Sequence, residues 1–117
     1  MSQVKFVNLT PHDVVLCPEP QSKIVIPKSG TVARVATRKT KVSEIAIEDK
    51  KIPVYEIQYG NIEGLPEPQP GVIYIVSLLV LQAVRGSRSD VVAPDTSPDS
   101  AIRDNSGNII CVKGFTR

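Results

Sequence analysis

The sequence has few of the residues that most often carry out catalysis or stack on nucleic-acid bases. Its 117 residues include no tryptophan, one histidine, two cysteines, two phenylalanines and three tyrosines. With so few aromatic rings, the core has to be built from valine, isoleucine and leucine. Few rings remain for stacking on bases.

Excess positive charge is also missing. The formal net charge is +2, with 14 basic and 12 acidic residues. A protein that follows a nucleic-acid backbone presents a denser basic face, because each phosphate contact uses its own lysine or arginine. Polymeric DNA or RNA is therefore not an expected partner.

The usual catalytic and metal-binding sets cannot be assembled from these residues. His12 is the only histidine and follows Pro11 in a turn, so a nucleophile has no ordinary base within reach. One histidine and two distant cysteines do not make a zinc site, and neither Gly-rich phosphate-binding pattern occurs. We expect no enzyme activity, no metal and no cofactor.

The two cysteines and the apolar segments indicate where in the cell the protein is expected. Cys17 and Cys111 each lie among apolar neighbours and are predicted to be reduced thiols in a cytosolic core. The chain starts Met-Ser-Gln-Val-Lys, with no apolar signal segment. Its longest apolar stretch, Val72 to Val84, is shorter than a membrane span. The sequence therefore predicts a cytoplasmic protein without membrane contact.

Length and composition predict one domain covering residues 1–117. Hydrophobic residues make up 41% and charged residues 22%, which is globular composition. Short β-branched runs, separated by proline and glycine, are typical of strands. The expected strands are Lys5–Leu9, Val14–Cys17, Lys23–Ile26, Thr31–Thr37, Val42–Ile47, Val54–Tyr59, Val72–Val76 and Asn108–Val112.

Two of the strand pairs are expected to be hairpins. Lys5–Leu9 and Val14–Cys17 are joined by a turn-forming Thr-Pro-His-Asp segment. Val42–Ile47 and Val54–Tyr59 alternate apolar and polar residues around the charged reversal 48–51, which predicts a hairpin with one face in water. The fold class expected is mainly β (α+β), an antiparallel sheet or partly closed barrel.

One short helix is predicted after residue 77. Ser77 suits its N-cap, the apolar segment 78–84 forms it, and Gly86 beyond Arg85 ends it. This helix is apolar nearly all round, so a sheet, a second subunit or both must cover it. We therefore expect a symmetric homo-oligomer, a dimer or a trimer of dimers.

The polar segment from Arg85 to Gly107 is the candidate functional loop. Its arginines are suited to grip phosphate or carboxylate oxygens, which predicts an anionic small ligand. The candidate ligand-binding residues are Arg85, Arg88, Asp90, Arg103, Asp104 and Asn105. The alternative, given equal weight, is structural: Arg85 closes the helix dipole, Arg88 pairs with Asp90, and Arg103 pairs with Asp104.

Two further clusters have simpler interpretations. The aspartates at 90, 95, 99 and 104 lack the spacing of a calcium loop, and Asp95 and Asp99, each of which follows a proline, are predicted to form turns rather than to bind a metal. The basic run Arg38–Lys41 is expected to be a solvated loop rather than a phosphate site. A turn role is likewise preferred over acid–base chemistry for His12.

Several segments together resemble a known family. The sequences Asn-Leu-Thr-Pro-His at 8–12, Pro-Lys-Ser-Gly-Thr-Val-Ala-Arg-Val at 27–35, Ile-Tyr-Ile-Val-Ser at 73–77 and Arg-Ser-Asp-Val at 88–91 are similar to those of phage Thoeris anti-defence sponges. These proteins sequester cyclic ADP-ribose isomers without cleaving them. The resemblance spans nearly the whole chain and implies a homo-oligomer with nucleotide pockets near subunit boundaries, acting in the cytoplasm of an infected host cell.

Three functions therefore compete. The first is sequestration of a cyclic nucleotide signal, with Arg85, Arg88 and Arg103 on its phosphates. The second is a phage structural or regulatory protein-interaction module that has no small-molecule ligand and uses the apolar helix or an edge strand. The third and weakest is a phosphodiesterase or nucleosidase using Asp90 or Asp104.

Overall fold

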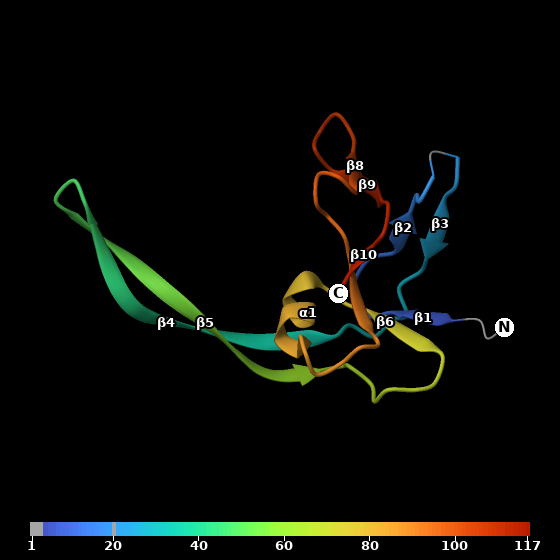
Figure 1. Cartoon of the computed structure of the whole chain (residues 1–117), viewed down its shortest axis with the longest axis horizontal. Coiled ribbons are helices and arrows are strands. Elements are labelled where there is room, and N and C mark those ends of the chain that lie inside the picture. The colour runs from blue at the N-terminus through green and yellow to red at the C-terminus, as the bar shows by residue number, and fades with distance from the viewer. Residues whose placement is uncertain (1–3, 20) are drawn as a thin grey trace.

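The computed structural model describes residues 4–19 and 21–117. Figure 1 shows two small sheets that form a body and one long hairpin that projects from it. The elements in order are β1 (Lys5–Asn8), β2 (Val14–Leu16), β3 (Ile24–Ile26), β4 (Arg34–Ile47), β5 (Lys50–Glu63), β6 (Val72–Ile75), α1 (Leu78–Val84), β7 (Val91–Pro94), β8 (Ala101–Arg103), β9 (Ile109–Val112) and β10 (Phe115–Thr116).

The first sheet and the helix hold most of the core. Its strand order is β1-β6-β7-β10, in which β1–β6 and β6–β7 are parallel and β7–β10 is antiparallel. Strand β6 is central and its Ile75 is fully buried. Helix α1 contributes Val80, Leu81 and Val84 to the main apolar cluster. Eight of the fifteen buried apolar side chains of the described residues thus lie on α1, β6 and β7.

The second sheet stands beside the first and carries the two cysteines. Its order is β3-β2-β9-β8, with β2 and β9 parallel and the other two pairs antiparallel. Because Leu16 is in register with Val112, Cys17 and Cys111 lie next to each other and form a disulfide with a Cα–Cα distance of 5.9 Å. The prediction of two reduced thiols is therefore wrong.

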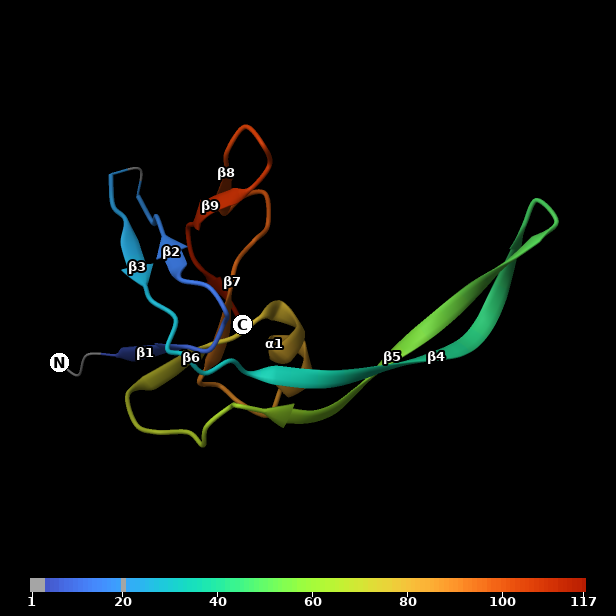
Figure 2. The ribbon, with the colours of Figure 1, turned by 180° about the vertical axis from the view of Figure 1, so that it is seen from behind.

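Strands β4 and β5 form an arm, residues 34–63, that leaves the body (Figures 1 and 2). Only Glu48 and Asp49 connect the strands, and both have positive φ angles, 50° and 67°, as a type I′ turn requires. Register shifts between Val35 and Thr37 and between Lys41 and Ser43 interrupt the ladder. Such bulges bend and twist a hairpin, and the arm is curved in both views.

The mainly β class with one short helix is confirmed, and the described residues form no closed barrel. Within that class, the two sheets of the body are mixed rather than purely antiparallel, with three parallel and three antiparallel strand pairs among the described residues. The expected hairpin of the first two strands is wrong, because β1 pairs with β6 and β2 pairs with β3 and β9.

Asn8 explains why the first two strands separate. Its buried side-chain amide donates to the carbonyls of His12 and Ile26, at 2.9 and 3.0 Å. Its Oδ1 accepts from the backbone N–H and the hydroxyl of Thr10. These bonds form a local turn that sends the chain from the first sheet into the second.

The helix follows its prediction residue by residue. Ser77 is the N-cap and its hydroxyl accepts from the N–H of Val80 at 3.3 Å. Gly86 takes a φ of +87° one residue beyond the Arg85 C-cap. The sheet covers only one side of the helix, and Leu78 and Leu79 remain 47% and 42% exposed. Among the described residues, no helix is long and apolar enough to cross a membrane.

Candidate functional site

The six candidate ligand-binding residues fall in two separate places. Arg85, Arg88 and Asp90 lie in the segment from the end of α1 to the start of β7. Arg103, Asp104 and Asn105 lie at the β8–β9 hairpin of the other sheet, on the opposite side of the body in Figure 1. The three arginines therefore do not form one site within a single chain.

Arg88 has a structural role. Its Nε donates to Asp90 Oδ1 at 2.8 Å and its Nη2 donates to Asp90 Oδ2 at 2.9 Å. Nη2 also donates to the carbonyl of Pro66 at 2.9 Å, and the guanidinium lies 5.9 Å from the ring centre of Tyr74. The Tyr74 hydroxyl donates to Glu67 O. Arg88 and Tyr74 thus fasten the proline-rich connector before β6 to the sheet.

The ion pair shifts the pKa values of both Arg88 and Asp90. The hydrogen bonds from Arg88 hold the pKa of Asp90 below its ordinary value, although burial opposes this effect. The same bonds raise the pKa of Arg88. Both side chains are partly buried, at 17% and 16% exposure. Asp90 is therefore committed to a charged partner rather than available as a general acid or base.

The hairpin residues form a turn. Arg103 Nη1 donates to the carbonyl of Gly107 at 2.7 Å, rather than to Asp104 as the structural alternative expected. Asp104 Oδ1 accepts from the N–H groups of Ser106 and Asn108, at 2.8 and 3.0 Å. Asn105 is exposed within this turn, and Arg85 is exposed at the helix end.

The remaining candidate clusters are also accounted for. Asp95 Oδ1 accepts from Ser97 N, as a turn-forming aspartate does, and no metal-binding group of acidic, histidine or cysteine residues occurs in the described parts of the chain. The basic run 38–41 lies in strand β4 and not in a loop. There Lys39 covers the ring of Tyr55 at 4.3 Å and Lys41 pairs with Glu44.

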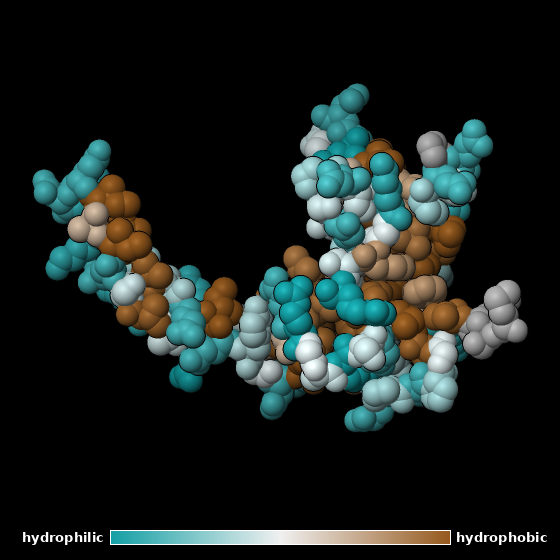
Figure 3. Space-filling view, in the orientation of Figure 1, coloured by the Kyte–Doolittle hydropathy of each residue, from teal (hydrophilic) through white to brown (hydrophobic). Residues whose placement is uncertain are grey.

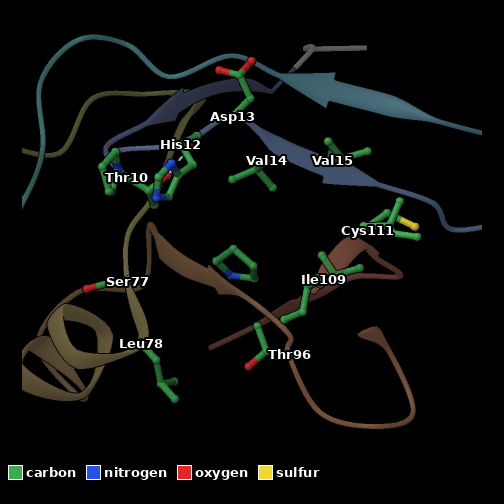
Figure 4. Close-up of a pocket in the computed structure, with 14 residues that line it drawn as sticks. Thr10, His12, Asp13, Val14, Val15, Ser77, Leu78, Thr96, Ile109 and Cys111 are labelled. Atoms are coloured by element: carbon green, nitrogen blue, oxygen red, sulfur yellow. Dashed lines mark hydrogen bonds between the residues drawn. The ribbon is translucent and has the colours of Figure 1, made fainter. Parts of the chain in front are cut away.

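A groove of about 440 Å³ lies between the two sheets and the start of α1. Figure 4 shows Val14 of β2, Ile109 of β9 and Leu78 of α1 around a common opening. Its walls are mainly aliphatic. We call it the β2–β9 groove, lined by residues 10–15, 77, 78, 94, 96 and 109–112.

A second cavity of about 270 Å³ lies at the base of the arm. Three of the segments that carry the family resemblance meet there: Leu9 to Pro11, Val32 to Val35, and Ser77. Arg34 is its one arginine and is exposed. None of the six residues selected from the sequence lines this cavity or the β2–β9 groove.

The arm carries the feature that sequence reasoning missed. The expected hairpin with one face in water has both faces in water, and Figure 3 shows apolar side chains along it. Seven large apolar residues of the arm are 41–55% exposed: Val42, Ile45, Ile47, Ile52, Tyr55, Ile57 and Tyr59. The signal in the sequence lies within β5, where the apolar residues change from even positions, Ile52 and Val54, to odd positions, Tyr55, Ile57 and Tyr59. Because successive side chains of a strand point to opposite faces, both faces of the hairpin carry apolar residues.

Comparisons of the chain with protein-family models, with curated proteins and with solved structures found no match. The resemblance to anti-defence sponges therefore stays a prediction. What the chain does has to be argued from its arm, groove and cavity.

Proposed function

We propose that this protein is a homo-oligomeric interaction module whose arm packs against a second copy of the chain. The observation that carries the proposal is the set of seven half-exposed apolar side chains on the arm. Soluble monomers seldom present so many half-exposed large apolar side chains on one projecting element, and large exposed apolar surfaces usually mark an interaction site.

The arm has little to hold it in place within one chain. Between Val35 and Ile62 no residue is buried, and only Val54 is half-buried. At the base, the Tyr59 hydroxyl and Gln82 Oε1 of α1 lie 3.3 Å apart. An isolated two-stranded hairpin is at best marginally stable in water. A partner that covers the arm supplies the burial it lacks.

The gain from burial is large enough to drive association. Burying seven half-exposed side chains is worth roughly 5–10 kcal/mol, at about 1.5–3 kcal/mol for each fully buried side chain. A two-fold dimer makes the contact twice, so both arms contribute about 10–20 kcal/mol. Lost translational and rotational freedom opposes this by an estimated 4–15 kcal/mol. Reciprocal contacts therefore favour a symmetric dimer over a single contact.

A second copy is favoured as the partner because the body has its own uncovered apolar surface. Leu78, Leu79, Ile109 and Ile110 are 40–50% exposed. In a closed two-fold dimer, the apolar arm of each copy can cover the apolar surface on the body of the other copy. This function needs no small-molecule ligand, metal or catalytic group, and we propose that it operates in the cytoplasm of a phage-infected cell.

Sedimentation velocity over a range of concentrations tests the proposal. The wild-type chain should sediment as a dimer, and Ile45→Lys/Ile52→Lys should sediment as a folded monomer, because charge on the arm cannot be buried. Ile24→Lys is the matched control, since Ile24 is 50% exposed on β3 of the body. A wild-type monomer at every concentration would contradict the proposal.

Sequestration of a cyclic nucleotide is the second candidate, favoured by the cavity at the arm base. The resemblance segments surround it and Arg34 supplies a guanidinium for a phosphate. Ligand at a hundred times its dissociation constant should stabilise the protein by about 2.7 kcal/mol. We expect a cyclic ADP-ribose isomer to raise the melting temperature of the wild type but not of Arg34→Ala, and to be recovered uncleaved. An unchanged melting curve would reject this candidate.

A further inference from the structure

We propose that the distal face of the arm docks into the β2–β9 groove of a second copy. The proposal rests on the proposed function, because it names the surface that receives the arm. Two observations carry it: the groove is aliphatic and open, and one face of the arm tip is aliphatic and uncovered.

The arm tip has a defined apolar face. Ile45 is directly opposite Ile52, and directly opposed residues of an antiparallel pair lie on the same side of the ladder. Ile47 and Val54 lie two residues from these along their strands and share that side. The distal face is therefore Ile45, Ile47, Ile52 and Val54, and three of the four are 41–55% exposed.

The groove has the matching chemistry. Leu78 of α1 and Ile109 and Ile110 of β9 are 47%, 40% and 50% exposed at its walls. Val14 forms part of its floor and is buried. The charged carboxylate of Asp13 points away from the labelled aliphatic side chains in Figure 4. The row of aliphatic side chains on the distal face of the arm can contact such walls without burying a charge.

The arm of the same chain does not fill this groove. Figures 1 and 2 show the arm directed away from β2 and β9, with its tip at the far end of the molecule. Fourteen-residue strands span about 45 Å at about 3.3 Å per residue. The whole molecule measures 61 × 38 × 23 Å. The arm is therefore long enough to lie across the body of a second copy.

The exposed apolar area of the two docking surfaces is in the range of a small specific interface. Three side chains of the distal face and three of the groove are each about half exposed. At on the order of 80 Å² each, they present about 480 Å² per chain and about 960 Å² in a two-fold pair, close to the ~1,000 Å² that a specific interface needs. A two-fold pair exchanges both arms and leaves neither groove open.

A complementation experiment tests the docking site with the full-length chain. Ile52→Lys changes the arm, and Ile110→Lys changes the groove. Leu78→Glu is a second groove variant, because the first turn of a helix tolerates an acidic residue. Ile102→Lys is the control, 40% exposed on β8 of the same sheet but outside the groove. Circular dichroism confirms the fold of each.

Each arm or groove variant should weaken self-association at least about thirtyfold, as loss of a central apolar contact does, while Ile102→Lys should not. A fluorescently labelled Ile52→Lys chain should gain anisotropy when titrated with Ile110→Lys, which has an intact arm. It should not gain anisotropy when titrated with unlabelled Ile52→Lys.

Two results would overturn the docking site. Groove variants that dimerise like the wild type while Ile52→Lys is monomeric would show that the arm packs elsewhere, and the proposed function would survive. Equal anisotropy with both titrants, or none with either, would exclude the reciprocal arm–groove contact. A wild-type monomer would remove the proposed function and the docking site together.

Discussion

The body and the arm are built from the same kinds of residue and differ in what surrounds them. In the body, Val76 and Val91 are fully buried in the apolar cluster that includes α1, and Ile75 is fully buried in a second cluster with Val14 and Val92. Ile45 and Ile57 of the arm are 55% and 53% exposed in strands of equal β-propensity. The comparison shows that strand-forming sequence alone does not provide burial. In the arm, a second layer of structure is missing from the chain itself.

The largest difference should appear when one isoleucine is truncated in each region. Ile75→Ala removes a fully buried side chain and should lower the free energy of unfolding by about 2–5 kcal/mol. Ile45→Ala should change it by less than about 0.5 kcal/mol under conditions where the chain is monomeric. Urea denaturation followed by circular dichroism measures both. A similar loss for the two variants would contradict the comparison.

Loss of the disulfide should destabilise the body and spare the arm. Cys17 and Cys111 are 94 residues apart, so their bond restricts the unfolded chain strongly. Cys17→Ser/Cys111→Ser should lower the free energy of unfolding by about 2–4 kcal/mol. Differential scanning calorimetry of this variant, with reduced wild type as a second comparison, gives the value. An unchanged transition would show that the bond does not contribute.

The junction of arm and body depends on one glycine. Gly64 has a φ of +81°, and a Cβ there would stand 2.5 Å from the carbonyl oxygen of Val32. Gly64→Ala should therefore cost about 1–3 kcal/mol, because the backbone must shift. Gly107→Ala is the control, since it also has positive φ but meets nothing within 4 Å. Thermal melts that do not separate the two variants would rule out the steric cause.

The smallest expected effect concerns the ion pair of the body. Arg88 makes the pKa of Asp90 lower in the folded protein than in the unfolded chain. The stabilisation from the pair is therefore fully present above about pH 4, the ordinary pKa of aspartate, and is lost as the pH falls through the lower pKa of the folded state. Asp90→Asn should reduce stability at neutral pH by about 1–2 kcal/mol and flatten the acid limb of the stability curve. The free energy of unfolding of the wild type and of Asp90→Asn is measured from pH 3 to 7. Parallel pH dependences for the two proteins would show that the ion pair does not contribute.

Local signals in the sequence predicted local structure well. Ser77, the apolar run after it and Gly86 define the helix through hydrogen bonds within a few residues, and the helix spans 78–84 as predicted. The turn roles of Asp95 and Asp104 are equally local. Interactions of this kind depend little on the rest of the chain.

Long-range pairing could not be predicted in this way. The parallel pairing of β1 with β6 joins segments 67 residues apart, and the turn signal after Leu9 did not distinguish a hairpin from a change of sheet. The pairing of β2 with β9 brings Cys17 to Cys111, which apolar neighbours alone did not indicate. Arg103 was selected for its charge, but its partner is a backbone carbonyl that the hairpin geometry supplies.

Hydrogen–deuterium exchange at several protein concentrations tests the central claim most directly. If the arm is held by a second copy, amides of residues 34–63 should exchange slowly at high concentration and faster on dilution. Amides of β6, residues 72–75, which lie in the body outside the groove, should exchange at the same rate throughout. Arm exchange that does not depend on concentration would contradict the claim that a second copy covers the arm.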